Sequence, residues 1–188
     1  KKKFLAPFAR GEKIGCYALT EPQAGSNAAA LATKAVRKGD RYVINGAKAW
    51  ITNGGVADAA IVYVNTDPAK GEKGITALVV ERGTPGFKVG KEEKKLGIHA
   101  TACTELSFTD CEVPAGNRLG NEGDGYKIAL STLDGGRIGI AAQATGIAQG
   151  AFEQALAYAQ QRQAFGHPIA DFQAIQFMLA DMATEIDA

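Results

Sequence analysis

Residues 39–52 read Gly-Asp-Arg-Tyr-Val-Ile-Asn-Gly-Ala-Lys-Ala-Trp-Ile-Thr, and this stretch decides the fold class of the region around it. Gly39 and Asp40 are turn residues with an apolar-containing run on each side. Two such runs around a Gly-Asp turn predict a β-hairpin, with one strand at residues 31–38 and the other at Arg41–Thr52.

Short strands are predicted on both sides of this hairpin. They lie at residues 14–20, 59–65, 75–81, 87–89 and 104–113. The breaks between them contain Asp67-Pro68 with Gly71 and Gly74, and then Thr84-Pro85-Gly86. Many short strands without intervening helices favour an antiparallel β-barrel or sandwich.

After Pro114 the pattern becomes helical. Apolar or small residues recur with helical spacing at positions 140, 144, 147, 148, 151 and 155. A Gly-His-Pro break at 166–168 predicts the end of this helix. A second helix follows, with apolar residues at 172, 175, 179, 182 and 186, and its pattern still runs at Ala188.

These patterns predict an α+β chain in separate parts. An antiparallel β-barrel or sandwich domain is followed by the first long helices of an antiparallel helical bundle. We assign residues 1–13 to the end of a preceding helical region and 14–118 to the β-domain. Residues 119–188 are assigned to the start of a C-terminal helical bundle that we expect to be truncated.

The composition argues against several classes of function. With 21 basic and 20 acidic residues the formal net charge is +1, so no basic field exists to hold nucleic acid or an anionic membrane. Three cysteines without CxxC spacing and two histidines argue against a disulfide framework and a metal site, and they suit a reducing compartment. No apolar run has the length of a membrane span.

Two segments contain residue types suited to a planar, oxygen-rich ligand. Residues 17–26 lead from a strand into a turn whose amides, with the Thr20 and Ser26 hydroxyls, could hydrogen-bond such a ring or a phosphate. Trp50 and Thr52 are two apart on a strand and share a face, which places a flat aromatic ring beside a hydroxyl. Ordinary turn chemistry and a core tryptophan explain the same residues, so each segment alone leaves both interpretations open.

Glycines recur along the long helix, and each interior glycine costs about 1 kcal/mol relative to alanine. That cost is tolerated where another backbone or a ligand approaches closely. Tight helix packing is the simpler explanation for Gly146 and Gly150. Both explanations stay open for Gly135 and Gly136.

Taken in order, four separated segments resemble the acyl-CoA dehydrogenase family, closest to its short-chain (butyryl-CoA) branch. They are residues 17–26, Trp-Ile-Thr at 50–52, Leu-Asp-Gly-Gly-Arg at 133–137, and Arg-Gln-Ala-Phe-Gly at 162–166 with Phe-Gln-Ala-Ile-Gln at 172–176. Lys-Leu-Gly-Ile-His at 95–99 and Glu-Leu-Ser-Phe at 105–108 look like the family's last β-domain strands. The resemblance implies a fragment with the flavin-binding β-domain and the start of the C-terminal helical domain.

The resemblance implies FAD as cofactor and assigns site residues to it. Thr20 is implied to bond the pyrimidine end of the flavin ring, Thr52 to lie near N5, and Arg162 and Gln173 to reach the FAD of a neighbouring subunit. The implied cofactor-binding residues are Tyr17, Leu19, Thr20, Gly25, Ser26, Trp50, Ile51, Thr52, Arg162, Phe165 and Gln173. The implied substrate-binding residues are Ser26, Asp134, Gly136 and Arg137.

The implied reaction is the α,β-dehydrogenation of a short-chain acyl-CoA to the trans-2-enoyl-CoA, a step of fatty acid β-oxidation. Electrons would pass to electron-transferring flavoprotein. Such chemistry needs a carboxylate base. One branch of the family has its glutamate at the position of Gly136, and the other has it beyond the end of this chain. We therefore assign no catalytic residue.

The resemblance further implies a homo-oligomer, as a tetramer, in the bacterial cytoplasm or the mitochondrial matrix. Two alternatives share the same fold. One is an acyl-CoA oxidase, which passes electrons to oxygen. The other is a non-catalytic flavin- or CoA-binding assembly module.

Overall fold

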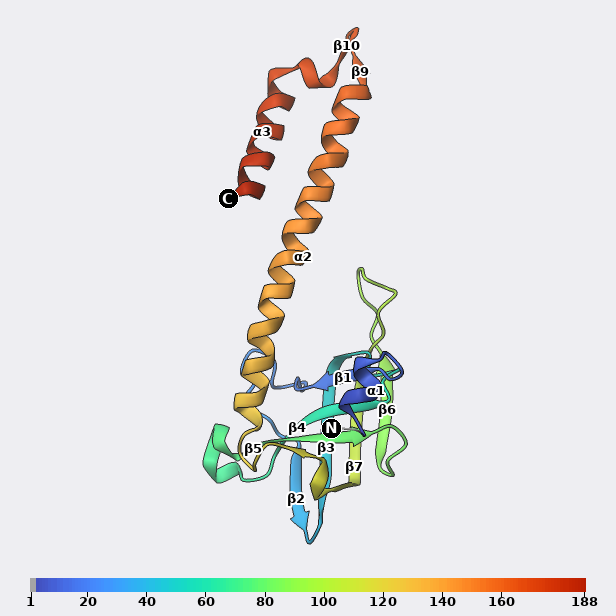
Figure 1. Cartoon of the computed structure of the whole chain (residues 1–188), viewed down its shortest axis with the longest axis vertical. Coiled ribbons are helices and arrows are strands. Elements are labelled where there is room, and N and C mark those ends of the chain that lie inside the picture. The colour runs from blue at the N-terminus through green and yellow to red at the C-terminus, as the bar shows by residue number, and fades with distance from the viewer. Residues whose placement is uncertain (1–2) are drawn as a thin grey trace. The chain divides into compact units, whose positions relative to one another are not determined.

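The computed structural model describes residues 3–188 and divides into two compact units (Figure 1). Unit 1 extends to Ser131, and unit 2 comprises Thr132–Ala188. In the region assigned to a preceding helical segment, one short helix is present, α1 at Leu5–Ala9, and residues 1 and 2 lie outside the described residues. The domain bounds expected from the sequence stay a prediction.

Unit 1 is built on one eight-stranded sheet with the order β6-β7-β3-β2-β4-β5-β8, and β1 pairs with β4 beside this path. The strands are β1 (Gly15–Ala18), β2 (Lys34–Lys38), β3 (Arg41–Thr52), β4 (Ala59–Asn65), β5 (Ile75–Glu81), β6 (Phe87–Glu92), β7 (Cys103–Pro114) and β8 (Arg118–Leu119). Short 3-10 turns lie at η1 (Pro68–Gly74) and η2 (Ala115–Asn117).

The fold class expected from the sequence is confirmed, with a refinement of the sheet. Most neighbouring strands are antiparallel, but β1 runs parallel to β4 with Gly15 opposite Ala59, and β2 meets β4 in parallel at Lys34 and Asn65. The sheet is therefore mixed. It is sandwich-like and does not close into a barrel.

The core of unit 1 follows from the apolar face of these strands. Fully burying a large apolar side chain contributes roughly 1.5–3 kcal/mol. One cluster packs along β3, β4, β5 and β7 and includes Tyr42, Ile44, Val62, Leu78, Leu106 and Val113. A second joins the segment after β1 to the start of α2 (Gly125–Gln161) through Leu19, Leu31, Tyr63, Ile75 and Ala129.

The turn between β5 and β6 contains two glycines in the left-handed region. Gly83 and Gly86 both have φ of 83°. The Gly86 carbonyl accepts a hydrogen bond from the Thr109 amide at 2.9 Å. A Cβ on Gly86 would overlap the Thr109 carbonyl oxygen, whereas a Cβ on Gly83 would meet nothing within 4 Å. The close approach of the Thr109 backbone thus explains the glycine at position 86. No such approach exists at Gly83.

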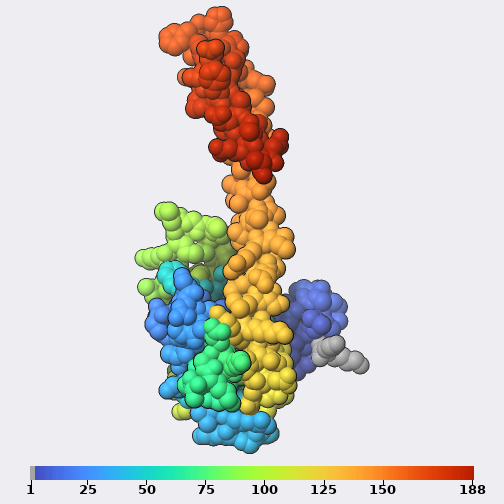
Figure 2. All heavy atoms as spheres, turned by 90° about the vertical axis from the view of Figure 1, so that its left-hand side faces the viewer, coloured from blue at the N-terminus to red at the C-terminus, as the bar shows by residue number. Residues whose placement is uncertain are grey.

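Unit 2 contains most of α2, a short hairpin of β9 (Gln163–Ala164) and β10 (His167–Pro168), a 3-10 turn η3 (Ile169–Asp171), and α3 (Gln173–Asp187). Figures 1 and 2 show α3 running back beside the last turns of α2. The predicted stripe of the second helix is the half-buried face of α3, at positions 172, 175, 179, 182 and 186. On α2 the half-buried or buried positions in this unit are Phe152, Ala155, Leu156 and Ala159, so most of the stripe predicted there is exposed.

The free cysteines Cys16, Cys103 and Cys111 are all buried. Burial raises the pKa of the Cys16 thiol to about 11, despite the nearby charge of Arg82, and it raises that of Cys111 to about 11. We expect iodoacetamide at pH 8 to alkylate Cys16 and Cys111 at least tenfold more slowly in the folded protein than in denaturant, as measured by peptide mass spectrometry. Equal rates in the two states would contradict this burial.

Candidate functional site

The segment that follows β1 forms the first part of the site. Ala18 and Leu19 are buried, and the chain then turns so that the Glu21 and Ala24 backbones exchange hydrogen bonds at 3.1 and 3.0 Å. The turn leaves Gly25 and Ser26 exposed. We call the segment from Leu19 to Thr33 loop 19–33. Its start is fixed by burial of Leu19, and its exposed part presents polar groups to solvent.

Tyr17, a predicted cofactor residue, has its side chain engaged within unit 1. Its ring centroid lies 5.0 Å from that of Tyr63, and its hydroxyl donates to the Ala129 carbonyl at 3.2 Å. Tyr17 therefore joins β1 to the start of α2. A role at the cofactor stays a prediction for this residue.

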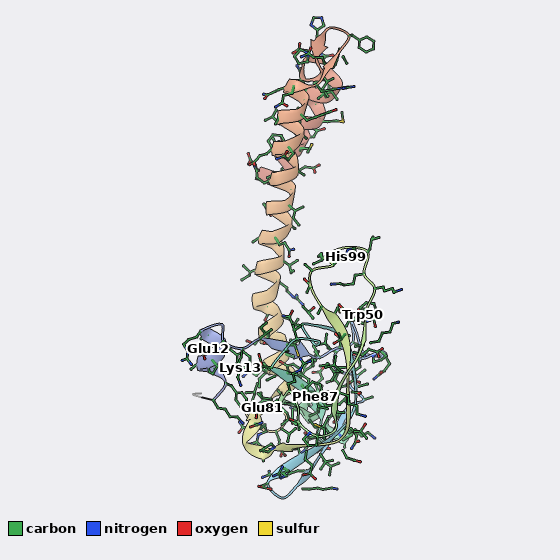
Figure 3. All side chains as sticks on the ribbon, turned by 90° about the vertical axis from the view of Figure 1, so that its right-hand side faces the viewer. Glu12, Lys13, Trp50, Glu81, Phe87 and His99 are labelled. Carbon is green, nitrogen blue, oxygen red and sulfur yellow. The ribbon has the colours of Figure 1, made fainter. Side chains whose placement is uncertain are left out.

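The end of β3 forms the second part of the site. Trp50 is 57% exposed and Thr52 is exposed, while Ile51 between them is 1% exposed. Trp50 has φ of 59°, at a register shift between Lys48 and Ile51 in the pairing of β3 with β7. A bulky residue in the left-handed region is strained, and such strain is found at functional sites. Trp50 lies at the end of the sheet from which the His99 loop extends (Figure 3), so it is not a core tryptophan.

These two segments lie against each other. The Ala49 amide donates to the Thr20 carbonyl at 2.9 Å. The residue before Trp50 is thus bonded to the residue that opens the turn. Within residues 3–188 the side chains of Thr20, Ser26, Trp50 and Thr52 have no hydrogen-bond partner. One aromatic face and three hydroxyls on these two segments are therefore available to a ligand.

Under this surface lies an ion pair that the sequence interpretation missed. Lys48 is 0% exposed and Glu21 is 2% exposed, and the Lys48 Nζ lies 2.7 Å from the Glu21 Oε1. Simple alternation places Lys48 on the same face as Trp50 and Thr52. The register shift after Lys48 breaks that alternation and turns Lys48 inward, so no pattern in the sequence indicated it.

The two groups of this pair respond differently to burial. Desolvation acts to raise the pKa of Glu21, but the Lys48 charge and the hydrogen bonds from Lys48, Thr33 and Ala32 lower it overall. Burial lowers the pKa of Lys48 to about 8, although Glu21 opposes the shift by its charge and its hydrogen bond. Both groups are therefore ionised at neutral pH, with Lys48 close to its titration range.

In unit 2, the predicted cofactor residues gather where α2 turns into α3. The Arg162 carbonyl accepts the Ile169 amide at 2.8 Å, which closes the β9–β10 hairpin. Phe165 and Gly166 form its two-residue turn with φ of 52° and 84°, the pattern of a type I′ turn. Phe165 is 95% exposed and its ring meets Phe172 edge-on at 6.2 Å between centroids, and Gln173 begins α3.

The predicted substrate residues of unit 2 lie on α2. Asp134, Gly136 and Arg137 are exposed. In the described part of the chain, no atom outside the local helix lies within 4 Å of a Cβ built on Gly135, Gly136, Gly146 or Gly150. The described residues therefore do not supply the tight packing that would explain these glycines. The substrate role stays a prediction.

Other site classes find little support between residues 3 and 188. No group of three or more metal-ligating side chains is found there. His99 contacts the Lys95 carbonyl through its Nε2 at 2.8 Å, in an exposed loop. None of the helices in this range has both the length and the apolar character needed to cross a membrane.

Comparison with known proteins gives matches along nearly the whole chain. Residues 16–111 match the family described as acyl-CoA dehydrogenase, middle domain, and residues 123–188 match acyl-CoA dehydrogenase, C-terminal domain. The short-chain specific acyl-CoA dehydrogenase of Clostridium acetobutylicum is 55% identical over 188 residues, covering 100% of this chain and 50% of that protein.

Solved structures agree with these matches. Butyryl-CoA dehydrogenase from Megasphaera elsdenii superimposes with a TM-score of 0.96 at 53% identity, covering 99% of this chain and 49% of that one. A chain in a structure titled as the electron transferring flavoprotein of Acidaminococcus fermentans has a TM-score of 0.96 at 54% identity, with coverage of 99% and 49%. The chain spans about half the length of the relatives it matches. It belongs to the acyl-CoA dehydrogenase family.

Proposed function

We propose that this chain is the flavin-cradling part of an FAD-dependent short-chain acyl-CoA dehydrogenase, which desaturates an acyl-CoA to the trans-2-enoyl-CoA. One observation carries the proposal for the cofactor. The exposed Trp50 face and the unpartnered hydroxyls of Thr20, Ser26 and Thr52 lie on two segments bonded to each other between Thr20 and Ala49.

This donor set fits a flavin. An isoalloxazine ring has flat faces, which suit stacking on an indole, and carbonyl and nitrogen acceptors along its edge, which suit hydroxyl donors. The open space around Gly25 allows a ligand to approach the backbone there. When bound, the flavin would accept hydride from the β-carbon of the substrate.

The residues of the chain would bind and orient the reactants. Thr20 and Thr52 would fix the ring, and Ser26 would also hold the CoA part of the substrate. Arg162 is suited to a pyrophosphate by its fixed charge and planar donors, and with Phe165 and Gln173 it would serve the FAD of a neighbouring subunit. Asp134, Gly136 and Arg137 would face the thioester.

The proposed partners follow from the same family. Electrons would pass to electron-transferring flavoprotein, consistent with the match to a chain in a structure titled after such a flavoprotein. The working protein would be a homotetramer. The proposed location is the bacterial cytoplasm or the mitochondrial matrix.

We expect the full-length protein to purify yellow, with the absorption bands of bound FAD. Anaerobic butyryl-CoA should bleach those bands at least tenfold faster than palmitoyl-CoA. Electron-transferring flavoprotein should then reoxidise the protein faster than air does. A colourless protein that takes up no FAD would refute the cofactor, and faster reoxidation by oxygen would make it an oxidase instead.

A further inference from the structure

We propose that Glu21 and Lys48 are positioning residues, which hold loop 19–33 against the end of β3 so that its hydroxyls stand beside Trp50. This inference rests on the proposed flavin site. Neither side chain is exposed beyond 2%, so neither can touch a ligand at the surface. Their effect must pass through the backbone that they hold.

The Glu21 carboxylate is surrounded by donors on both oxygens. Its Oε1 accepts from Lys48 at 2.7 Å and from the Thr33 amide at 3.1 Å. Its Oε2 accepts from the Ala32 amide at 2.7 Å and from the Gln23 side chain at 2.7 Å. Because all these neighbours are donors, they require the ionised carboxylate. A protonated carboxyl or a side-chain amide at this position would point a hydrogen at another donor and lose a hydrogen bond. The carboxylate thereby ties the start of loop 19–33 to its end.

Lys48 ties this carboxylate to the sheet. Its Nζ also donates to the Leu19 carbonyl at 3.0 Å, which adds the first residue of the loop. The neighbours of Lys48 on β3 are bonded to the same loop on either side. The Ala47 carbonyl accepts from the Thr33 hydroxyl at 3.3 Å, and the Ala49 amide donates to the Thr20 carbonyl at 2.9 Å. Three successive residues of β3 therefore hold the loop immediately before Trp50.

Stability alone does not account for this arrangement. Replacing a buried ion pair by apolar residues of similar volume is often neutral or stabilising for a fold. A pair placed between two ligand-facing segments instead fixes their relative position through directional hydrogen bonds. A supporting shell of this kind is what keeps a binding site in its productive geometry.

The test is Lys48→Met in the full-length protein, which removes the charge but keeps most of the volume. After removal of flavin, FAD affinity is measured by quenching of flavin fluorescence, and we expect it to fall at least tenfold. Val113→Ala is the matched control. Val113 is buried in the sheet and belongs to neither ligand-facing segment, so this variant should lower stability while FAD affinity stays within twofold of the parent. Unchanged FAD affinity in Lys48→Met overturns the proposal.

A second readout does not depend on flavin. Hydrogen exchange of the Ala32 and Thr33 amides in the apoprotein should be at least tenfold faster in Lys48→Met, while the amides of Ala60 and Val62 in β4 keep their rates. Glu21→Gln should accelerate the same two amides, and it serves if Lys48→Met does not fold. Unchanged exchange at Ala32 and Thr33 overturns the inference. If the parent protein itself binds no FAD, the proposed function fails, while the exchange rates still decide whether the pair holds the loop.

Discussion

Replacing Trp50 with alanine in the full-length protein should weaken FAD binding by about 10- to 100-fold with almost no change in the free energy of unfolding. Trp50 is 57% exposed in unit 1, so its removal costs the fold few contacts. An indole stacked on a flavin ring would contribute roughly 1.5–3 kcal/mol through burial and aromatic geometry, which corresponds to that loss of affinity. The measurement is a fluorescence titration of the apoprotein with FAD, paired with denaturant unfolding.

Val56→Ala is the matched control for this substitution. Val56 is 54% exposed and follows the same strand end, but it belongs to neither ligand-facing segment. Its replacement should change neither FAD affinity nor stability. Trp50→Phe should recover most of the lost affinity, since it keeps a flat ring. An alanine variant that binds FAD as tightly as the parent would show that Trp50 does not face the cofactor.

Replacing Gly86 with alanine should destabilise unit 1 by roughly 2–5 kcal/mol. A non-glycine residue in the left-handed region costs about 1–2 kcal/mol. Gly86 has φ of 83°, and its new Cβ would also overlap the Thr109 carbonyl oxygen. Overpacking of that kind adds roughly 1–3 kcal/mol, because the strand must move to relieve it. Denaturant unfolding monitored by circular dichroism measures the change.

Gly83→Ala separates the two contributions. Gly83 has the same φ of 83° in the same turn, but the space around it is open. Its replacement should cost only about 1–2 kcal/mol, the part due to the backbone conformation. Equal losses at the two positions would show that the contact with Thr109 relaxes at no cost.

The strand bounds were well predicted where turn residues mark them. Strands β3, β4 and β5 begin and end at the predicted residues, because turn-forming glycine, proline and aspartate flank them. The direction of pairing was not predictable for β1. Alternation reports which face of a strand is buried, but it contains no information about its partner, so the parallel pairing of Gly15 with Ala59 could not be anticipated.

The sequence predicted the ligand-facing residues of the site better than the buried residues beneath them. Trp50 and Thr52 are both exposed and Ile51 between them is buried, which agrees with the shared face that their spacing predicts. Whether that face is exposed was left open by the sequence. The ion pair of Glu21 and Lys48 could not be predicted, because a register shift turns Lys48 inward and the hydrogen bonds that satisfy Glu21 come from residues 11 and 12 positions further along the chain. Hydrogen bonds between residues this far apart form only when the chain folds, so local sequence patterns do not reveal them.

The pairing of β3 with β7 also fixes when this unit can fold during synthesis. Arg41 at the start of β3 lies opposite Pro114 at the end of β7, so more than seventy residues separate these two partners along the chain. Contacts this distant in sequence slow folding, because the loop between them must close before they form. Strand β3 therefore emerges from the ribosome with one edge unpaired, and β7 covers that edge only later. A nascent chain stalled before residue 103 should therefore stay sensitive to protease. Its unpaired strand edge and exposed apolar surface would also make it a target for chaperones.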